Sequence, residues 1–524
     1  MQEYVQEKKT VALGAGFSLF GYALSTVMGL LTNILLYWRF DHSQAGSELN
    51  VWIIAFSFFA ILEPFARLGL SDGVQRFIGV YWVEKDWARI KGAIWGAFQL
   101  SFLASLVMIA CVYFLAPYIA GAYLSDSHSA IQLCKVLRCL SLYLVPIALT
   151  TIALAVLRAL NDIRHSVWIE TLCQKFGWLL VVLLVGFLPE NETRILWLAF
   201  GMVIVNSLSF AISVRSFSKA APKLSEHDAV YERKALFLFS APLVLQAAIL
   251  IFMKKCDIMM LGYFHNADNY VAQYNAAGIS TLIISNILLA FSSLFAPLIA
   301  KVSEKKDFQK MNELYKTVTR WMLYLTLPAA VIMLLFPTQI LAIFNLAPDP
   351  MLIGAFRILV CAQIVSTVSG HSGTMLIMSG YSRMILYINV LAVFANILLN
   401  ALLIPNYAMT GAAVATFAAI AIRNLLAVAC TAFFVRSQPF SLYTLVISFV
   451  SLLCGLLAYF AFSYLNGVLP GNPLFAHWAF QLALAGALFA LFYLPITAIA
   501  MHKDDRSFII DEVIPRCKKA LHGQ

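Results

Sequence analysis

The sequence predicts an all-α polytopic membrane protein with about 14 transmembrane helices, and its composition is the first reason. Of 524 residues, 61% are hydrophobic and 12% are charged, and the mean hydropathy is +0.83. Soluble domains are about 45–50% apolar and about 25% charged. This chain has too little polar surface to coat a soluble body of its length, which excludes a soluble enzyme, a disordered chain and a nucleic-acid-binding domain.

The spacing of the apolar segments is the second reason. A spanning helix needs about 20 mostly apolar residues, and the longest polar stretch lies around residues 217–233, so no soluble domain is expected. The first apolar run is too long for a cleaved signal peptide and should be retained as a helix. The fourteen predicted spans are 11–38, 51–76, 92–116, 138–158, 165–187, 195–215, 235–262, 271–299, 317–336, 353–379, 384–404, 411–435, 440–465 and 475–500.

The distribution of basic residues is the third reason, because cytoplasmic loops of membrane proteins are enriched in Lys and Arg. With Lys8 and Lys9 placed inside, the inside segments carry 25 of the 36 Lys and Arg residues, and the outside segments carry four. A wrong number of spans would scramble this alternation. Both termini are therefore expected in the cytoplasm, and the net charge of +10 reflects membrane orientation rather than a nucleic-acid partner.

Weak similarity between the two halves predicts an internal duplication. Four matches occur in order, at an offset that drifts from 222 to 216 residues. They pair Phe17-Ser18 with Phe239-Ser240, Lys85-Asp86-Trp87 with Lys306-Asp307-Phe308, Arg164 with Arg383, and Pro189 with Pro405. A duplicated unit of six helices enters the membrane from the same side in both copies, which predicts a parallel repeat with the working site between the lobes.

The duplication also predicts how the chain is divided. It predicts two six-helix lobes in parallel repeat, followed by two C-terminal helices that lie outside the repeat. The expected parts are an N-lobe over 1–216, a cytoplasmic linker over 217–234, a C-lobe over 235–436, appended helices over 437–501 and a cytoplasmic tail over 502–524.

Three segments resemble the multidrug/oligosaccharidyl-lipid/polysaccharide exporter superfamily, and within it the bacterial polysaccharide, or O-antigen, flippases. Residues 403–416 are similar to the signature Ile-Pro-x-Tyr-Gly-x-x-Gly-Ala-Ala-x-Ala-Thr, with Ala408 in place of the glycine after tyrosine. Pro405 is expected to end a helix there, and the small residues after it should allow close helix packing. The other two segments are Asp257 to Phe264 with Tyr274 to Ala277, and Gly69-Leu70-Ser71 with Arg76.

This resemblance implies a flippase that moves undecaprenyl-pyrophosphate-linked oligosaccharide repeat units across the bacterial inner membrane. Transport would occur by alternating access and would supply O-antigen, the outer part of lipopolysaccharide, or capsule biosynthesis. The resemblance implies no catalytic residue, no metal and no cofactor, with a proton or sodium gradient as the energy source. The implied partners are the lipid-linked oligosaccharide, membrane lipid, a polysaccharide polymerase and chain-length proteins.

Three other functions stay open. Cation-coupled multidrug exporters are expected to carry an acid in the first helix, and lipid II flippases are expected to carry arginines there. The run 11–38 of this chain has no charge. A membrane polysaccharide polymerase or ligase is expected to have a large outside loop that bears catalytic Arg or His. The longest outside segment here, about 118–137, has no such cluster. The chain is therefore expected not to be an enzyme.

Charged residues inside the predicted spans are the candidate site. A charge at the bilayer centre costs about 2.5–3.5 kcal/mol on insertion scales, so it usually faces a wet cavity or a partner. Lys175 and Arg423 lie near the middle of the fifth and twelfth runs, without an acid at helical spacing in the membrane core. They are the first candidates for contact with the anionic headgroup. The other substrate-binding candidates are Arg67, Lys254 and Lys255.

Two acids and one histidine are candidates for coupling transport to an ion gradient: Glu63, Asp257 and His371. Each has a structural alternative, because Glu63 can pair with Arg67 one helical turn away, and Asp257 can pair with Lys254. A lone histidine in a span is more often hydrogen-bonded across helices than used as a proton carrier. The five basic candidates and two acids leave a predicted net charge of +3 in a cavity between the lobes.

Overall fold

The computed structural model is all-helical, in agreement with the predicted fold class. It describes residues 21, 23–40, 47–124, 127–160, 162–189, 193–221, 224, 226–265, 269–304, 307–347, 349–468, 477–502 and 505. Over these residues, eleven helices are long and apolar enough to cross a membrane. Lys8, Lys9 and most of the predicted tail lie outside the described residues, as does the start of the first predicted span.

By its internal contacts the chain divides into two compact units, Met1–Asn275 with Asn400–Ala408, and Ala276–Leu399 with Met409–Gln524. The helices of the first unit begin with residues 23–39 and continue with α2 (Glu48–Arg67), α3 (Leu70–Glu84), α4 (Trp87–Tyr123), α5 (Ser127–Ser141), α6 (Leu144–Ala159), α7 (Ile163–Trp168), the π-helix η1 (Ile169–Phe176), α8 (Gly177–Gly186), α9 (Arg194–Ala220) and α10 (Arg233–Phe264).

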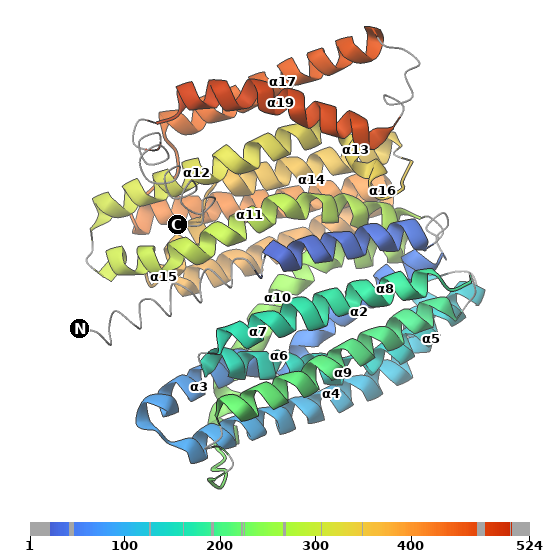
Figure 1. Cartoon of the computed structure of the whole chain (residues 1–524), viewed down its shortest axis with the longest axis vertical. Coiled ribbons are helices and arrows are strands. Elements are labelled where there is room, and N and C mark those ends of the chain that lie inside the picture. Colours follow the sequence, from blue (N-terminus) through green and yellow to red (C-terminus); the bar gives the residue numbers. More distant parts are fainter. Residues whose placement is uncertain are drawn as a thin grey trace, which may run out of the picture. The chain divides into compact units, whose positions relative to one another are not determined.

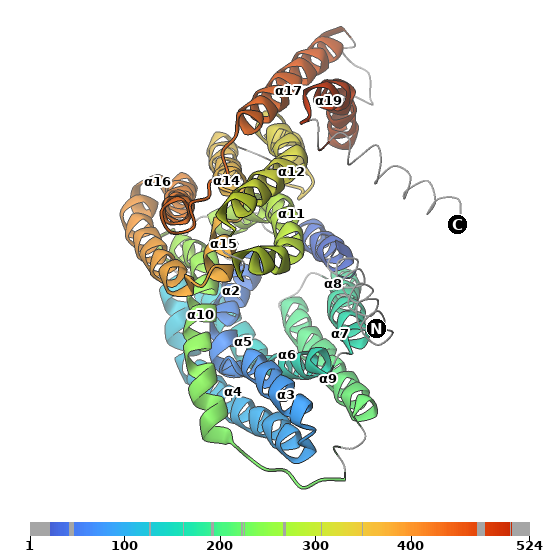
Figure 2. The same ribbon diagram turned by 90° about the vertical axis from the view of Figure 1, so that its left-hand side faces the viewer.

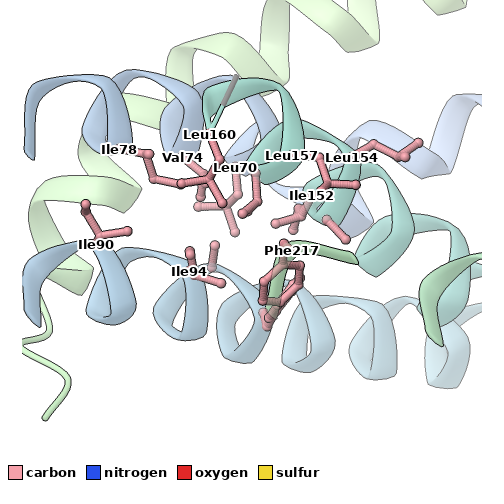
Figure 3. Packing of buried hydrophobic residues seen from close by; sticks show 14 of the residues in the cluster. Leu70, Val74, Ile78, Ile90, Ile94, Ile152, Leu154, Leu157, Leu160 and Phe217 are labelled. Atoms are coloured by element: carbon pink, nitrogen blue, oxygen red, sulfur yellow. The ribbon is translucent and has the colours of Figure 1, made fainter. Parts of the chain in front are cut away.

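The core of the first unit forms where α3, α4, α6 and α9 pack together. Figure 3 shows apolar side chains of α3 facing those of α4 and α6, with Phe217 of α9 beside them. Leu70, Val74 and Ile78 follow one another at one-turn spacing on α3, and each is 0% exposed. Lipid tails are as apolar as leucine, so these contacts act through close packing rather than through release of water. Figure 1 shows α4, α5 and α9 side by side in this unit.

The helices of the second unit extend to the C-terminal pair. They are α11 (Tyr270–Glu304), α12 (Phe308–Leu335), α13 (Pro337–Ala342), α14 (Pro350–Val368), α15 (Ser372–Met378), α16 (Ser382–Phe434), α17 (Leu442–Val468) and α19 (Trp478–Ala500), and α11 starts in the first unit. Figure 2 shows α17 and α19 side by side, and α17 also packs on α12.

Two helix starts have the same local structure at the predicted repeat offset. Asp86 precedes α4 and accepts a hydrogen bond from the backbone N–H of Arg89 at 3.0 Å. Asp307 precedes α12 and accepts one from the N–H of Lys310, also at 3.0 Å. Both aspartates have φ −85° and ψ 83°. An aspartate in this position satisfies a free N–H of the first helical turn, and its recurrence supports the internal repeat.

The expectation that Pro405 ends a helix is wrong. The helical backbone of α16 continues past Pro405 and breaks at Ala408, where φ is 46° and ψ is −125°. Proline removes one N–H and restricts its own φ, but it leaves the following residues free to complete the turn. A positive φ strains any residue with a Cβ, which explains why the resembling signature has glycine at this position. The small residues that follow are packed as predicted, since Ala412 and Ala413 are 0% exposed.

Replacement of Ala408 by glycine should therefore stabilise the protein by about 1 kcal/mol, because relief of backbone strain exceeds the added unfolded-state entropy. Ala413→Gly is the matched control, in a helical and fully buried position, and it should destabilise. The midpoints of thermal unfolding in detergent, measured by tryptophan fluorescence, compare the two variants. A lower midpoint for Ala408→Gly than for the unsubstituted protein would contradict the strain argument.

Candidate functional site

The acid and the base at the end of α2 form the ion pair that their spacing predicts. Arg67 Nη1 lies 3.9 Å from Glu63 Oε1, and the two side chains are 20% and 25% exposed. Four residues separate them, so they lie on one face of the helix. At this exposure the pair is open to further polar partners.

Lys175, on another helix, is electrostatically coupled to this pair. It lies near the end of η1, its side chain is exposed, and it interacts electrostatically with Glu63. Glu63 lies on a different helix from Lys175, so helical spacing in the sequence does not predict this partner. The π-helix is held from both ends, since Glu170 pairs with Arg158 at 3.6 Å and Gln174 donates to Asn206 Oδ1 at 3.2 Å. Runs of π-helix are rare and often mark functional sites.

Asp257 has a partner that the resemblance itself contains. The Tyr274 hydroxyl of α11 donates to Asp257 Oδ2 at 2.8 Å, and the aspartate is 6% exposed. The two ends of the Asp-to-Tyr pattern are thus bonded to each other, a structural role for this pattern. On the same helix, Lys254 is exposed and Lys255 is half-buried, and Lys255 interacts electrostatically with Asp257.

The start of α11 is also bonded to the first two helices of the chain. The Tyr37 hydroxyl donates to the Ala272 carbonyl at 2.5 Å, and the Ala272 N–H donates to Asn50 Oδ1 at 2.8 Å. Tyr37 and Asn50 are each 1% exposed. These contacts join the two halves of the predicted repeat within the first unit, and no pattern in the sequence predicts them.

Arg423 is the basic candidate residue in the second unit. Its Nε donates to Asn389 Oδ1 at 2.9 Å, and both residues lie on α16, on opposite sides of the break. Its Nη2 lies alongside Gly373 of α15, where a Cβ would be 3.9 Å away. No carboxylate within the described ranges forms an ion pair with this guanidinium, in contrast to the Glu63 group.

His371 lies at the start of α15, and its ring is close to the backbone of Leu288 in α11. This is the cross-helix contact that a lone histidine in a span usually makes. The sequence had a signal for Asn389 that was not used. Asn389, Asn396 and Asn400 follow at seven- and four-residue spacing on α16 and are at most 7% exposed.

The candidate residues fall into two groups. Arg423 and His371 belong to the second unit. The first unit contains Glu63, Arg67, Lys175, Lys254, Lys255 and Asp257. The structure thus brings Arg67 and Lys175 to one acid, places Lys255 near another, and leaves Arg423 with an amide as its partner.

The fold and these embedded charges are those of a multi-pass membrane protein. The chain is similar to the lipid II flippase MurJ in an inward closed conformation, with a TM-score of 0.69 at 17% identity over 93% of this chain and 99% of that one. An inward-facing multidrug resistance MATE transporter gives 0.65 at 13% identity, over 80% and 98%. The chain belongs to the polysaccharide biosynthesis protein family, whose model matches residues 49–345.

Two archaeal proteins are similar to it in sequence. An uncharacterized membrane protein of Methanocaldococcus jannaschii is 21% identical over 427 residues, which are 78% of this chain and 81% of that protein. A probable low-salt glycan biosynthesis flippase of Haloferax volcanii, Agl15, is 26% identical over 272 residues, which are 51% and 53%. Both the family and the fold agree with the resemblance identified in the sequence.

Proposed function

We propose that this protein is a flippase for lipid-linked oligosaccharides, and that the cargo is an undecaprenyl-pyrophosphate-linked repeat unit for O-antigen or capsule. The observation that carries the proposal is Arg423, a guanidinium inside a predicted span whose partner is a neutral amide. A pyrophosphate or an acidic sugar would supply the anion that this residue lacks among the described residues. The family assignment and the similarity to a probable glycan flippase support the same cargo class.

The finer architecture is part of this proposal. Fourteen spans arise if residues 23–39 and α11 are added to the eleven long helices and α16 counts as two, divided at Ala408. We assign six to each lobe of a parallel repeat and two to the C-terminal pair, with both termini in the cytoplasm. A reporter that is active only outside the cytoplasm should be silent after Gln524 and active in the 466–474 loop. The reverse pattern would refute this orientation.

Alternating access between the lobes then carries the headgroup across the membrane. Lys175, beside Glu63 and Arg67, and Arg423 would each contact the anionic headgroup in transit. Arginine offers a planar fork for bidentate phosphate contact, whereas lysine acts as a point charge. Glu63 is the proposed coupling acid, because its protonation would free the two basic groups beside it for the cargo.

Complementation tests the function directly. The gene should restore surface polysaccharide to a bacterial strain that lacks its own O-antigen or capsule flippase, with donors of known repeat-unit structure. Resistance to cationic drugs, measured in the same cells, tests the multidrug alternative. Absence of surface polysaccharide with every repeat unit, although the protein is present in the membrane, would refute the proposed cargo. Drug resistance in that case would support the alternative.

A further inference from the structure

The contact between Arg423 and Asn389 has a consequence for ligand chemistry. A guanidinium carries only N–H donors, so the amide that bonds it must present its oxygen. The orientation of the Asn389 amide is therefore fixed by its partner. The NH₂ group of Asn389 then points away from the hydrogen bond with Arg423 Nε. Its two N–H groups are not used in that bond and remain donors.

The described residues around the pair add no acceptor of opposite charge. Asn389 is 7% exposed, and a Cβ on Gly373 would lie 3.5 Å from Ile385 and 3.9 Å from the guanidinium Nη2, so apolar and small residues flank the pair on this side. Among the described residues, no acid forms an ion pair with Arg423. The pair thus combines the remaining guanidinium N–H groups with an amide NH₂, and it has a single full positive charge.

We infer that Asn389 is a positioning residue that aims Arg423 and, with it, forms a donor-only site for the anionic oxygens of the cargo headgroup. This inference rests on the proposed function and names the chemistry of one of its contacts, a phosphate or carboxylate group. Charge-assisted hydrogen bonds from N–H donors to such oxygens are stronger than neutral ones. A cationic ligand brings donors and positive charge, so this site repels it.

Asn389→Asp is the decisive substitution, because it keeps the shape of the side chain and reverses its chemistry. The new carboxylate would accept from Arg423 and neutralise it, so the site would be filled by the protein itself. We expect thermal stability at or above that of the unsubstituted protein, and at least a tenfold loss of anion binding. Asn396→Asp is the matched control, a buried asparagine on the same helix that is 1% exposed, and it should lower stability.

Binding is measured on the purified full chain in detergent, with two anionic probes that separate the sources of the anion. Farnesyl pyrophosphate represents the lipid pyrophosphate, with farnesol as its uncharged control, and digalacturonate represents acidic sugars. Loss of farnesyl pyrophosphate binding alone in Asn389→Asp assigns the site to the pyrophosphate, and loss of digalacturonate binding alone assigns it to the sugar. Arg423→Lys keeps the charge and loses the Nε contact, so it should weaken the affected probe about tenfold.

Unchanged binding of both probes by folded Asn389→Asp would overturn the inference. If that variant does not fold, Asn389→Ala is the alternative test. It removes the residue that orients Arg423 but keeps the positive charge, so binding should weaken about tenfold. Unchanged binding by Asn389→Ala would also overturn the inference. The two proposals fail separately. If the protein binds the probes in an Asn389-dependent way but does not complement a flippase deletion, the anion site stands and the flippase function is refuted.

Discussion

Arg423→Ala should reduce surface polysaccharide at least about tenfold in a complemented flippase deletion, at an unchanged amount of protein in the membrane. A hydrogen bond to a charged group contributes about 1.5–3 kcal/mol, and about 1.4 kcal/mol corresponds to a factor of ten. Export needs the anionic headgroup to be bound while it leaves water, so this loss acts on transport. Arg423→Gln should behave similarly, because it keeps a donor but removes the charge.

Lys175→Ala should show a loss of the same order for a different reason. Glu63 then keeps Arg67 as its partner at 3.9 Å, so the acid and base of α2 neutralise each other and no net positive charge remains in that group. Arg357→Ala is the control for both, since Arg357 makes a solvent-exposed hydrogen bond to the backbone carbonyl of Leu334 at 3.1 Å and the variant should export normally. Surface polysaccharide is compared with protein level in the membrane for each variant.

Normal export by both Lys175→Ala and Arg423→Ala, at normal abundance, would remove the cationic mechanism for these residues. Loss of protein rather than of transport would instead assign them to helix packing. The two variants also separate the two groups of charges, because a loss with Arg423 alone would confine headgroup contact to the second unit.

The sequence predicted the helices well because a spanning helix is defined by local composition. Runs such as 92–116 and 195–215 fall inside α4 and α9, which extend beyond them into polar ends. The pair of Glu63 and Arg67 was also predictable, since its partners are one turn apart. These features depend on residues that are close in the chain.

The features that the sequence missed depend on contacts between helices or on backbone detail. The interaction of Lys175 with Glu63 joins η1 to α2, and the bond of Asp257 to Tyr274 joins α10 to α11. The break at Ala408 was assigned to Pro405 because proline is the usual signal for a helix end. A single sequence gives no way to choose among the acids and amides that could meet a given base.

The buried ion pair between Arg320 and Asp505 was missed for the same reason. Arg320 lies near the start of the predicted span 317–336 and on α12, where it is 7% exposed, and its partner Asp505 is 3% exposed. The contact is bidentate, with Nε and Nη2 of the arginine at 3.0 and 3.1 Å from the two carboxylate oxygens. The indole of Trp321 also donates to this carboxylate at 2.9 Å.

Asp505→Ala should therefore destabilise the protein by about 3–5 kcal/mol, because removal of one partner leaves a buried charge without compensation. The midpoint of thermal unfolding in detergent should fall, and export should fall only as far as the amount of folded protein falls. Glu313→Ala, at an exposed acid on the same helix, should change stability by no more than about 0.5 kcal/mol. The double variant Arg320→Met with Asp505→Leu removes both charges and should recover most of the loss, since apolar replacement of a whole buried pair is often neutral. A double variant as unstable as Asp505→Ala would show that the hydrogen bond of Trp321 to Asp505, rather than the charge balance, stabilises this contact with α12.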